Sequence, residues 1–69
     1  MLEQNYRLAT EQEEDGRWLA EILDLPGVLA YGVTEQEAIA KAEAIAFRLI
    51  ADRLEETKIG TSQVSFAHA

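Results

Sequence analysis

Residues 35–56 constrain the fold of this chain more than any other stretch, because they include six alanines and no glycine or proline. Alanine has the highest helix propensity of all residues, whereas glycine and proline have the lowest, so we expect one long helix here. Its apolar residues recur with helical spacing, which predicts an amphipathic helix with one apolar stripe. The residues of this stripe are Ala38, Ile39, Ala42, Ile45, Ala46, Leu49 and Ile50.

The residues that flank this stretch indicate where the helix begins and ends. Thr34 and Glu37 form the pattern S/T-x-x-E of a capping box. In that motif the threonine oxygen accepts from a helical amide and the glutamate reaches back to the cap. Beyond the helix, Gly60 is expected to act as the stop.

Segments with alternating apolar and polar side chains flank the predicted helix, and such alternation is typical of strands. We expect four strands, over residues 5–10, 17–23, 28–33 and 63–67. Between the first two, Asp15-Gly16 is a strong hairpin signal, because glycine readily adopts the positive φ of a tight turn. Before the third, Pro26 fixes its own φ and Gly27 adds freedom, so the chain is expected to turn there.

The element order β-β-β-α-β predicts an α+β fold, with one helix on one face of a four-stranded sheet, in a single domain over residues 1–69. The connection through the helix is long enough for the last strand to lie parallel to the first and beside it. If Trp18, Ala20 and Ile22 face the helix, the other face of the sheet stays open. That open face would carry an apolar patch of the kind that usually marks an interface, formed by Leu19, Leu23, Leu29 and Tyr31.

The composition of the chain disfavours several classes of function. With no cysteine and a single histidine, disulfides, thiol chemistry and zinc clusters of the usual spacing are not expected. Six Lys and Arg against thirteen Asp and Glu give a net charge of −7, which repels phosphate backbones and favours basic partners, although it also serves simple solubility. Without a secretory signal or an apolar stretch long enough to cross a bilayer, a cytoplasmic location is expected.

Four carboxylates raise the alternative of a metal-dependent nuclease, in which clustered acids hold divalent ions about 4 Å apart. They belong to Glu21, Asp24, Glu37 and Asp52. The capping box explains Glu37, the turn before Pro26 explains Asp24, and the solvated side of the helix explains Asp52. His68 has no evident base or nucleophile partner, so we expect no catalytic residue, metal or cofactor.

Four short motifs follow one another between Trp18 and Ala38. They are an aromatic-x-Ala pattern at Trp18 and Ala20, then Leu25-Pro26-Gly27, then Gly32-x-Thr34, and finally Glu37-Ala38, with Gly16 in the turn that precedes them. In this order and spacing they resemble the HicB-like antitoxin domain. The resemblance implies a partial ribonuclease-H-like fold that lacks the catalytic carboxylates and silences a small basic ribonuclease of the HicA type by binding it.

The resemblance and the charge together predict a protein-binding antitoxin without enzymatic activity. Its partner contacts are expected at Leu19, Leu23, Leu29, Tyr31, Asp52 and Glu55. Many relatives carry an additional helix-turn-helix or ribbon-helix-helix segment that binds their own operator, and this chain ends without one, so autoregulation by DNA binding is not expected. The charge argues against direct nucleic-acid binding, and membrane binding is not expected either. The alternative is a solitary domain of this kind without a toxin, which acts in small-ligand binding or as an oligomeric interaction domain.

Self-association is expected as well, because one helix cannot cover both faces of a four-stranded sheet. The open face offers one route to a homodimer or higher oligomer. The third strand offers another, because it is an outer strand with few charges that could pair across a two-fold axis.

Overall fold

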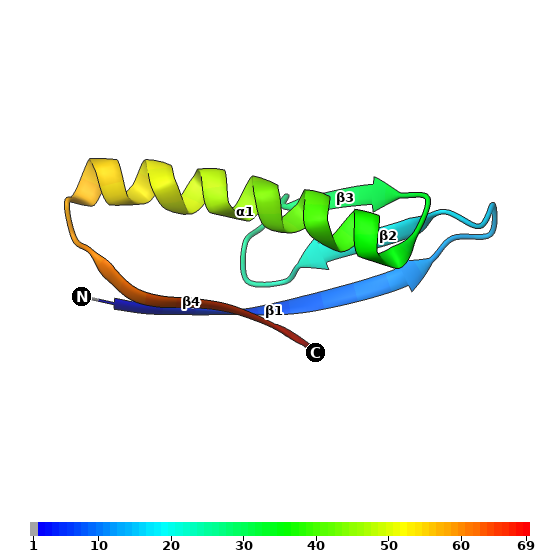
Figure 1. Cartoon of the computed structure of the whole chain (residues 1–69), viewed down its shortest axis with the longest axis horizontal. Coiled ribbons are helices and arrows are strands. Elements are labelled where there is room, and N and C mark those ends of the chain that lie inside the picture. The colour runs from blue at the N-terminus through cyan, green and yellow to red at the C-terminus, as the bar shows by residue number, and fades with distance from the viewer. Residues whose placement is uncertain (1) are drawn as a thin grey trace.

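The computed structural model describes residues 2–69, with side chains from residue 4 onward. Its elements in chain order are β1 (Leu2–Gln12), β2 (Trp18–Ile22), β3 (Leu29–Gly32), α1 (Glu35–Thr57) and β4 (Thr61–His68). The strands form one mixed sheet, and α1 lies along one side of it (Figure 1). The predicted α+β fold, with the order β-β-β-α-β, is therefore confirmed.

The strands are arranged in the order β3-β2-β1-β4. β4 runs parallel to β1, whereas the β1–β2 and β2–β3 pairs are antiparallel. The predicted position of the last strand, parallel to the first and beside it, is confirmed. It follows from the helical connection, which carries the chain across the sheet to its opposite edge.

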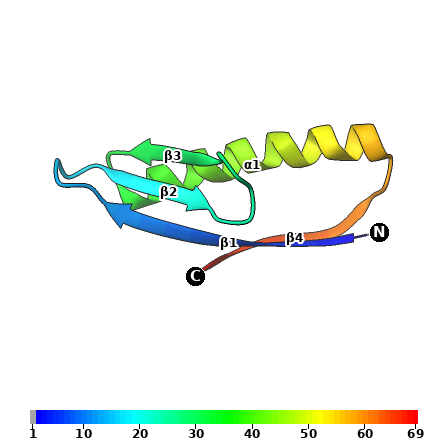
Figure 2. The ribbon, with the colours of Figure 1, turned by 180° about the vertical axis from the view of Figure 1, so that it is seen from behind.

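β1 is the longest strand, and it is longer than the expected residues 5–10. Its first part, up to Leu8, pairs with β4, and its second part, from Leu8 onward, pairs with β2. The hairpin of β2 and β3 and the strand β4 therefore lie along opposite halves of β1 (Figure 2). This offset makes the molecule elongated, with principal extents of 42 × 19 × 17 Å.

The connection between β1 and β2 is a tight hairpin closed by backbone hydrogen bonds. The N–H of Glu13 donates to the Arg17 carbonyl at 2.7 Å, and the N–H of Gly16 donates to the Glu13 carbonyl at 2.9 Å. Gly16 has a φ of 91°, which glycine adopts without the steric cost that a Cβ would bring. The hairpin predicted from Asp15-Gly16 is confirmed.

A second turn, between β2 and β3, is closed by the N–H of Val28, which donates to the Leu25 carbonyl at 3.1 Å. Pro26 and Gly27 are its central residues, and Gly27 has a φ of 83°, in agreement with the residue preferences of a type II turn. Leu25 and Val28 are both only 2% exposed. The turn is therefore anchored in the core by the residues on either side of Pro26-Gly27.

Thr34 is the N-cap of α1, and its hydroxyl oxygen accepts from the Glu37 N–H at 3.1 Å. The Glu37 carboxylate accepts from the N–H of Val33 at 3.0 Å, one residue before the expected donor Thr34. This hydrogen bond, together with the charge of Lys41 3.4 Å away, holds the pKa of Glu37 below its ordinary value. The capping box therefore forms with its second bond displaced by one residue.

The expectation that Gly60 stops the helix is wrong. The C-cap is Lys58, which has a left-handed backbone with φ of 58° and whose N–H donates to the Leu54 carbonyl at 2.9 Å. The Lys58 ammonium also donates to the Glu55 carbonyl at 3.3 Å, one of the carbonyls that a helix end leaves without a helical partner. A lysine therefore takes the position for which glycine is usually preferred.

The core lies between α1 and the sheet face that carries Ala20 and Ile22. Its buried apolar residues are Tyr6, Leu8, Ala20, Ile22, Leu25, Val28, Ala38, Ile39, Ala42, Ala46 and Ile50. Five residues of the predicted helical stripe are among them, and the other two, Ile45 and Leu49, are partly buried against the core. Trp18 is also partly buried there, so the predicted choice of sheet face is confirmed.

Gly32, at the end of β3, permits a very close approach between the sheet and the helix. A Cβ atom at this position would lie 2.5 Å from the backbone nitrogen of Ala38. Nearby, the Thr10 hydroxyl donates to the Glu35 carboxylate at 2.7 Å and ties the same end of α1 to β1. Because Gly32 has no side chain, the N-terminal end of α1 packs directly against β3. The hydrogen bond between Thr10 and Glu35 ties the same end to β1.

We expect Gly32→Ala to lower the free energy of unfolding by roughly 1–3 kcal/mol, because the added methyl group meets helix backbone rather than a flexible side chain. Urea unfolding followed by far-UV circular dichroism measures this change. An unchanged denaturation midpoint would show that α1 can move away from β3 at no cost.

Candidate protein-binding face

The sheet face opposite α1 carries an apolar patch formed by β2, β3 and the turn between them. Leu19 pairs with Tyr31 across the two strands, and Leu29 pairs with Glu21. Leu23, Leu29 and Tyr31 are 37%, 41% and 42% exposed, whereas Leu19 is half-buried. The four apolar residues predicted for the open face therefore lie close together, with large parts of three side chains accessible.

Arg17 covers one end of this patch. Its guanidinium lies 4.7 Å from the centre of the Tyr31 ring, within the range of a cation–π interaction. The same guanidinium forms an ion pair of 2.8 Å with Asp15 in the hairpin turn. Hydrogen bonds from the backbone and the side chain of Arg17 hold the pKa of Asp15 below its ordinary value.

Asp24 has a more specific role than the turn position expected from the sequence. Its carboxylate accepts from the backbone N–H of Arg7 at 2.8 Å and from two nitrogens of the Arg7 guanidinium at 2.8 and 3.2 Å. Just before it, the N–H of Leu23 donates to the Arg7 carbonyl at 2.9 Å. The Asp24 side chain therefore accepts a hydrogen bond from the Arg7 amide of β1, at the point where the backbone of β2 turns away from β1.

Two carboxylates share the open face with the apolar patch, Glu21 within it on β2 and Glu11 beside it on β1. Glu21 pairs with Ala9, and Glu11 pairs with Leu19, so both acids share the open face with Leu19. Glu11 is exposed and Glu21 is half-buried. The face thus combines exposed apolar side chains with the negative charges of Glu11 and Glu21, in a chain whose net charge is −7.

The structure does not bring the six predicted partner-binding residues into one surface. Asp52 and Glu55 lie on exposed positions of α1, which covers the opposite side of the sheet from Leu19, Leu23, Leu29 and Tyr31. The two helical acids therefore contribute to the electric field around the molecule rather than to the open face itself.

The carboxylates considered for a nuclease also have separate surroundings. Asp24 binds Arg7 and Glu37 binds the Val33 amide, whereas Asp52 is exposed on α1. Among the side chains of residues 4–69, no group of three or more acids or histidines is placed to hold a metal ion. His68 is exposed at the end of β4. No helix in the described chain is long and apolar enough to span a membrane.

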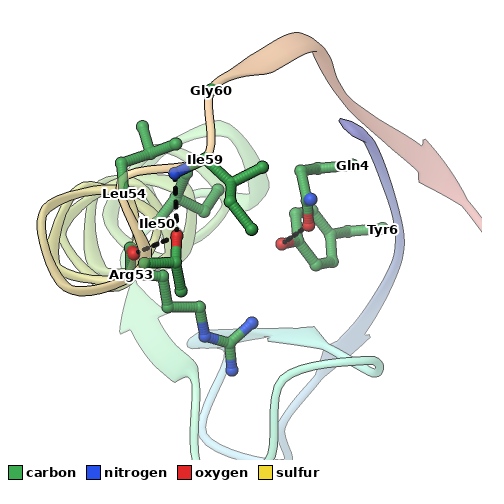
Figure 3. A pocket seen from close by; sticks show the side chains of 8 residues that line it. Gln4, Tyr6, Ile50, Arg53, Leu54, Ile59 and Gly60 are labelled. Atoms are coloured by element: carbon green, nitrogen blue, oxygen red, sulfur yellow. Dashed lines mark hydrogen bonds between the residues drawn. The ribbon is translucent and has the colours of Figure 1, made fainter. Parts of the chain in front are cut away.

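A pocket of about 240 Å³ lies between the C-terminal end of α1 and the start of β1 (Figure 3). Apolar side chains form most of its wall, and Tyr6 donates a hydrogen bond of 2.7 Å to Gln4 within it. Among the described side chains, the guanidinium of Arg53 in this wall has no ion-pair or hydrogen-bond partner. Sequence patterns did not indicate this pocket, because the residues that line it come from opposite ends of the chain.

Phe47 is another exposed residue that the sequence interpretation did not single out. It is 51% exposed and makes an edge-to-face contact with Phe66 of β4, at 5.4 Å between ring centres. Phe66 stacks in turn on Tyr6 of β1 at 5.7 Å. The signal in the sequence was an aromatic residue in α1 outside the predicted apolar stripe.

Comparisons with family models, with curated proteins and with solved structures found no match to this chain. The likeness to HicB-like domains therefore remains a hypothesis that depends on the short motifs from Trp18 to Ala38.

We expect the free energy of unfolding to fall as the pH is lowered from about 5 toward 2, and Asp24→Asn to reduce this slope. Hydrogen bonds from Arg7 hold the pKa of Asp24 below its ordinary value in the folded chain. Such a group stabilises the fold above its unfolded pKa, and this contribution is lost as the pH falls through its folded pKa. Urea unfolding across this pH range measures the slope.

Asp52→Asn is the matched control, because no described residue forms an ion pair or hydrogen bond with the Asp52 side chain. It should leave the pH slope as in the parent chain. Equal slopes for the parent chain and for Asp24→Asn would contradict a stabilising role of the Arg7–Asp24 pair.

Proposed function

We propose that this chain is a protein-binding antitoxin of the HicB-like kind, which neutralises a small basic ribonuclease of the HicA type by direct binding in the cytoplasm. The observation that carries the proposal is the open sheet face, where exposed apolar side chains lie together with the carboxylates of Glu11 and Glu21. Apolar residues at the centre of an interface supply most of the binding energy, and tyrosine is enriched among the residues that matter most. Tyr31, with 42% of its surface exposed, would be such a contact.

The charge of the chain supports a basic partner. A net charge of −7 attracts a positively charged protein over long distances and speeds its encounter with this chain. Asp52 and Glu55 would act in this way only, because they lie on the far side of the sheet from the apolar patch. Glu11 and Glu21 would also meet basic side chains of the partner at close range.

The test is to search the neighbouring reading frames for a small basic protein, to purify it and to assay it for RNA cleavage with and without this chain. We expect the chain to abolish cleavage and to cleave no RNA itself, with or without Mg²⁺ or Mn²⁺. Association should slow between low and physiological salt, because a Debye length of about 8 Å at 0.15 M screens the attraction between the two proteins.

Tyr31→Gln should weaken inhibition by about tenfold or more, as expected for a contact at the centre of an interface. Phe47→Gln is the matched control, because it changes an aromatic residue of similar exposure away from the open face. Equal inhibition by both variants would contradict binding through the open face, and RNA cleavage by the chain alone would favour the nuclease alternative.

A second candidate function, the binding of a small ligand by a solitary domain, is favoured by the pocket in Figure 3. Its volume of about 240 Å³ is below the usual range for drug-sized ligands, so it would suit a small molecule. Its apolar wall and the unpaired guanidinium of Arg53 suit a short apolar chain that ends in a carboxylate.

Titration with hexanoate, followed by NMR shifts of the residues that line the pocket, tests this second function, with hexanol as the uncharged comparison. Arg53→Gln should weaken hexanoate binding by about tenfold, because a charged hydrogen bond is lost. Arg48→Gln, which changes an exposed arginine of α1 outside the pocket, is the control and should have no effect. Equal shifts with hexanol and hexanoate would contradict a role for Arg53.

A further inference from the structure

β4 forms one outer edge of the sheet, and nothing in the described chain pairs with its outer side. Outer strands usually carry features that prevent pairing with another chain, such as lysine, proline, a bulge or inward charges. After an irregularity beside Ser62 at its start, β4 keeps a continuous register with β1 from Gln63 to His68. No residue from 61 to 67 is charged or a proline, so most of this edge lacks such protection.

The direction of the unpaired backbone groups follows from one hydrogen bond. The N–H of Ala69 donates to the Leu8 carbonyl of β1 at 2.9 Å. Because successive residues of a strand direct their backbone groups to opposite sides, the odd-numbered residues of this segment face β1. The amide and carbonyl groups of Val64, Phe66 and His68 therefore point away from the sheet and are free to pair.

Exposed apolar side chains of α1 also lie near this edge. Ala40, Ala44, Phe47 and Ala51 are all exposed, and their spacing places them on one side of the helix. Phe47 contacts Phe66, so the border of this apolar strip meets β4, together with Glu43 one turn before Phe47. The unpaired strand edge thus lies beside a mainly apolar strip of the helix.

We infer that β4 pairs antiparallel with β4 of a second copy of this chain, which joins the two sheets into one continuous sheet with both helices on the same face. This inference goes beyond the proposed function and does not depend on the proposed toxin. The two-fold axis brings the outward-facing residues Val64 and Phe66 of one copy against the same residues of the other. Phe47 of each copy then loses solvent exposure at the junction.

The charge of the chain indicates which binding partner suits this surface. Two copies that each carry −7 repel one another, and this repulsion is least where neutral surfaces meet. The strand β4 itself carries no carboxylate from Thr61 to His68, so a basic partner would gain less here than at the acidic surfaces of the chain. The neutral edge of β4, with its apolar strip on α1, therefore suits a second copy of this chain better than a charged partner.

The edge formed by β3 is a poorer choice for the same pairing. β3 has four residues against eight in β4, so it offers fewer backbone groups. The N–H of Ile22 in β2 donates to the carbonyl of Val28 at 2.9 Å, so the backbone groups of Val28 face β2. Ala30 lies two residues later, and its backbone groups therefore face β2 as well. The outward-facing amides there are those of Leu29 and Tyr31, which makes the two edges distinguishable by experiment.

Amide hydrogen exchange, measured residue by residue by NMR at low and high protein concentration, tests the inference together with sedimentation. We expect a monomer–dimer equilibrium in which the amides of Val64 and Phe66 gain at least about tenfold protection as the dimer forms. The amides of Ser65 and Ala67 should be protected at both concentrations, because they face β1. Protection of Leu29 and Tyr31 instead would assign the dimer to β3, and a monomer at all concentrations would overturn the inference.

Two matched variants separate this surface from the open face. Phe47→Gln should weaken dimerisation by about tenfold or more, and it should leave the fold intact because the side chain is half exposed and glutamine is a good helix former. Tyr31→Gln should leave dimerisation unchanged. Weaker dimerisation of Tyr31→Gln, with Phe47→Gln unchanged, would place the dimer interface on the open face. Equal dimerisation of both variants and the parent chain would also contradict pairing through β4.

A failure of the toxin assay leaves these expectations unchanged. A failure of β4 pairing likewise leaves the inhibition test through Tyr31 unchanged, so the two proposals can be judged separately.

Discussion

The whole sheet depends on β1, because it is the strand that joins β4 to the hairpin of β2 and β3. Its first half pairs with β4 in parallel, and its second half pairs with β2 in antiparallel orientation. Leu8 takes part in both pairings. Where β2 turns away from β1, its backbone no longer reaches the Arg7 amide. The Asp24 carboxylate accepts the hydrogen bond from this amide instead. This hydrogen bond gives the Arg7 amide a partner at the junction, so β1 continues toward β4 with its backbone paired. Two short pairings therefore combine into a four-stranded sheet within a chain of only 69 residues.

The same offset explains why the molecule has unused surfaces. The N-terminal end of α1 lies against the sheet at Gly32, where helix and strand backbones nearly touch. Its C-terminal end extends past the hairpin of β2 and β3 and over the half of the sheet that contains only β1 and β4 (Figure 1). Fewer side chains are available to fill the space there, and the pocket beside Tyr6 and the half-exposed Phe47 both lie in this half. The open face opposite α1 has no second layer in the described chain.

Much of this fold follows from local sequence signals, because those signals act over a few residues. The Asp15-Gly16 turn, the Thr34 cap and the stripe of α1 each depend on neighbours within one or two turns of chain. The features that could not be predicted depend on contacts between distant residues. Arg7 is 17 positions from Asp24, and Phe47 gains its partner only when β4 returns to β1. The C-cap at Lys58 was missed for a different reason, since its left-handed backbone is unusual for lysine and Gly60 offered the stronger signal.

The distribution of charge allows the two proposed surfaces to work together. Pairing through β4 would join neutral edges, so it would add no close contact between like charges. It would also leave both open faces accessible, because the β2 and β3 strands lie at the outer ends of the combined sheet. Two copies held together carry twice the negative charge of one, which strengthens the field that attracts a basic partner to either face. In this arrangement self-association would not compete with binding of the ribonuclease, and it would increase the rate of encounter.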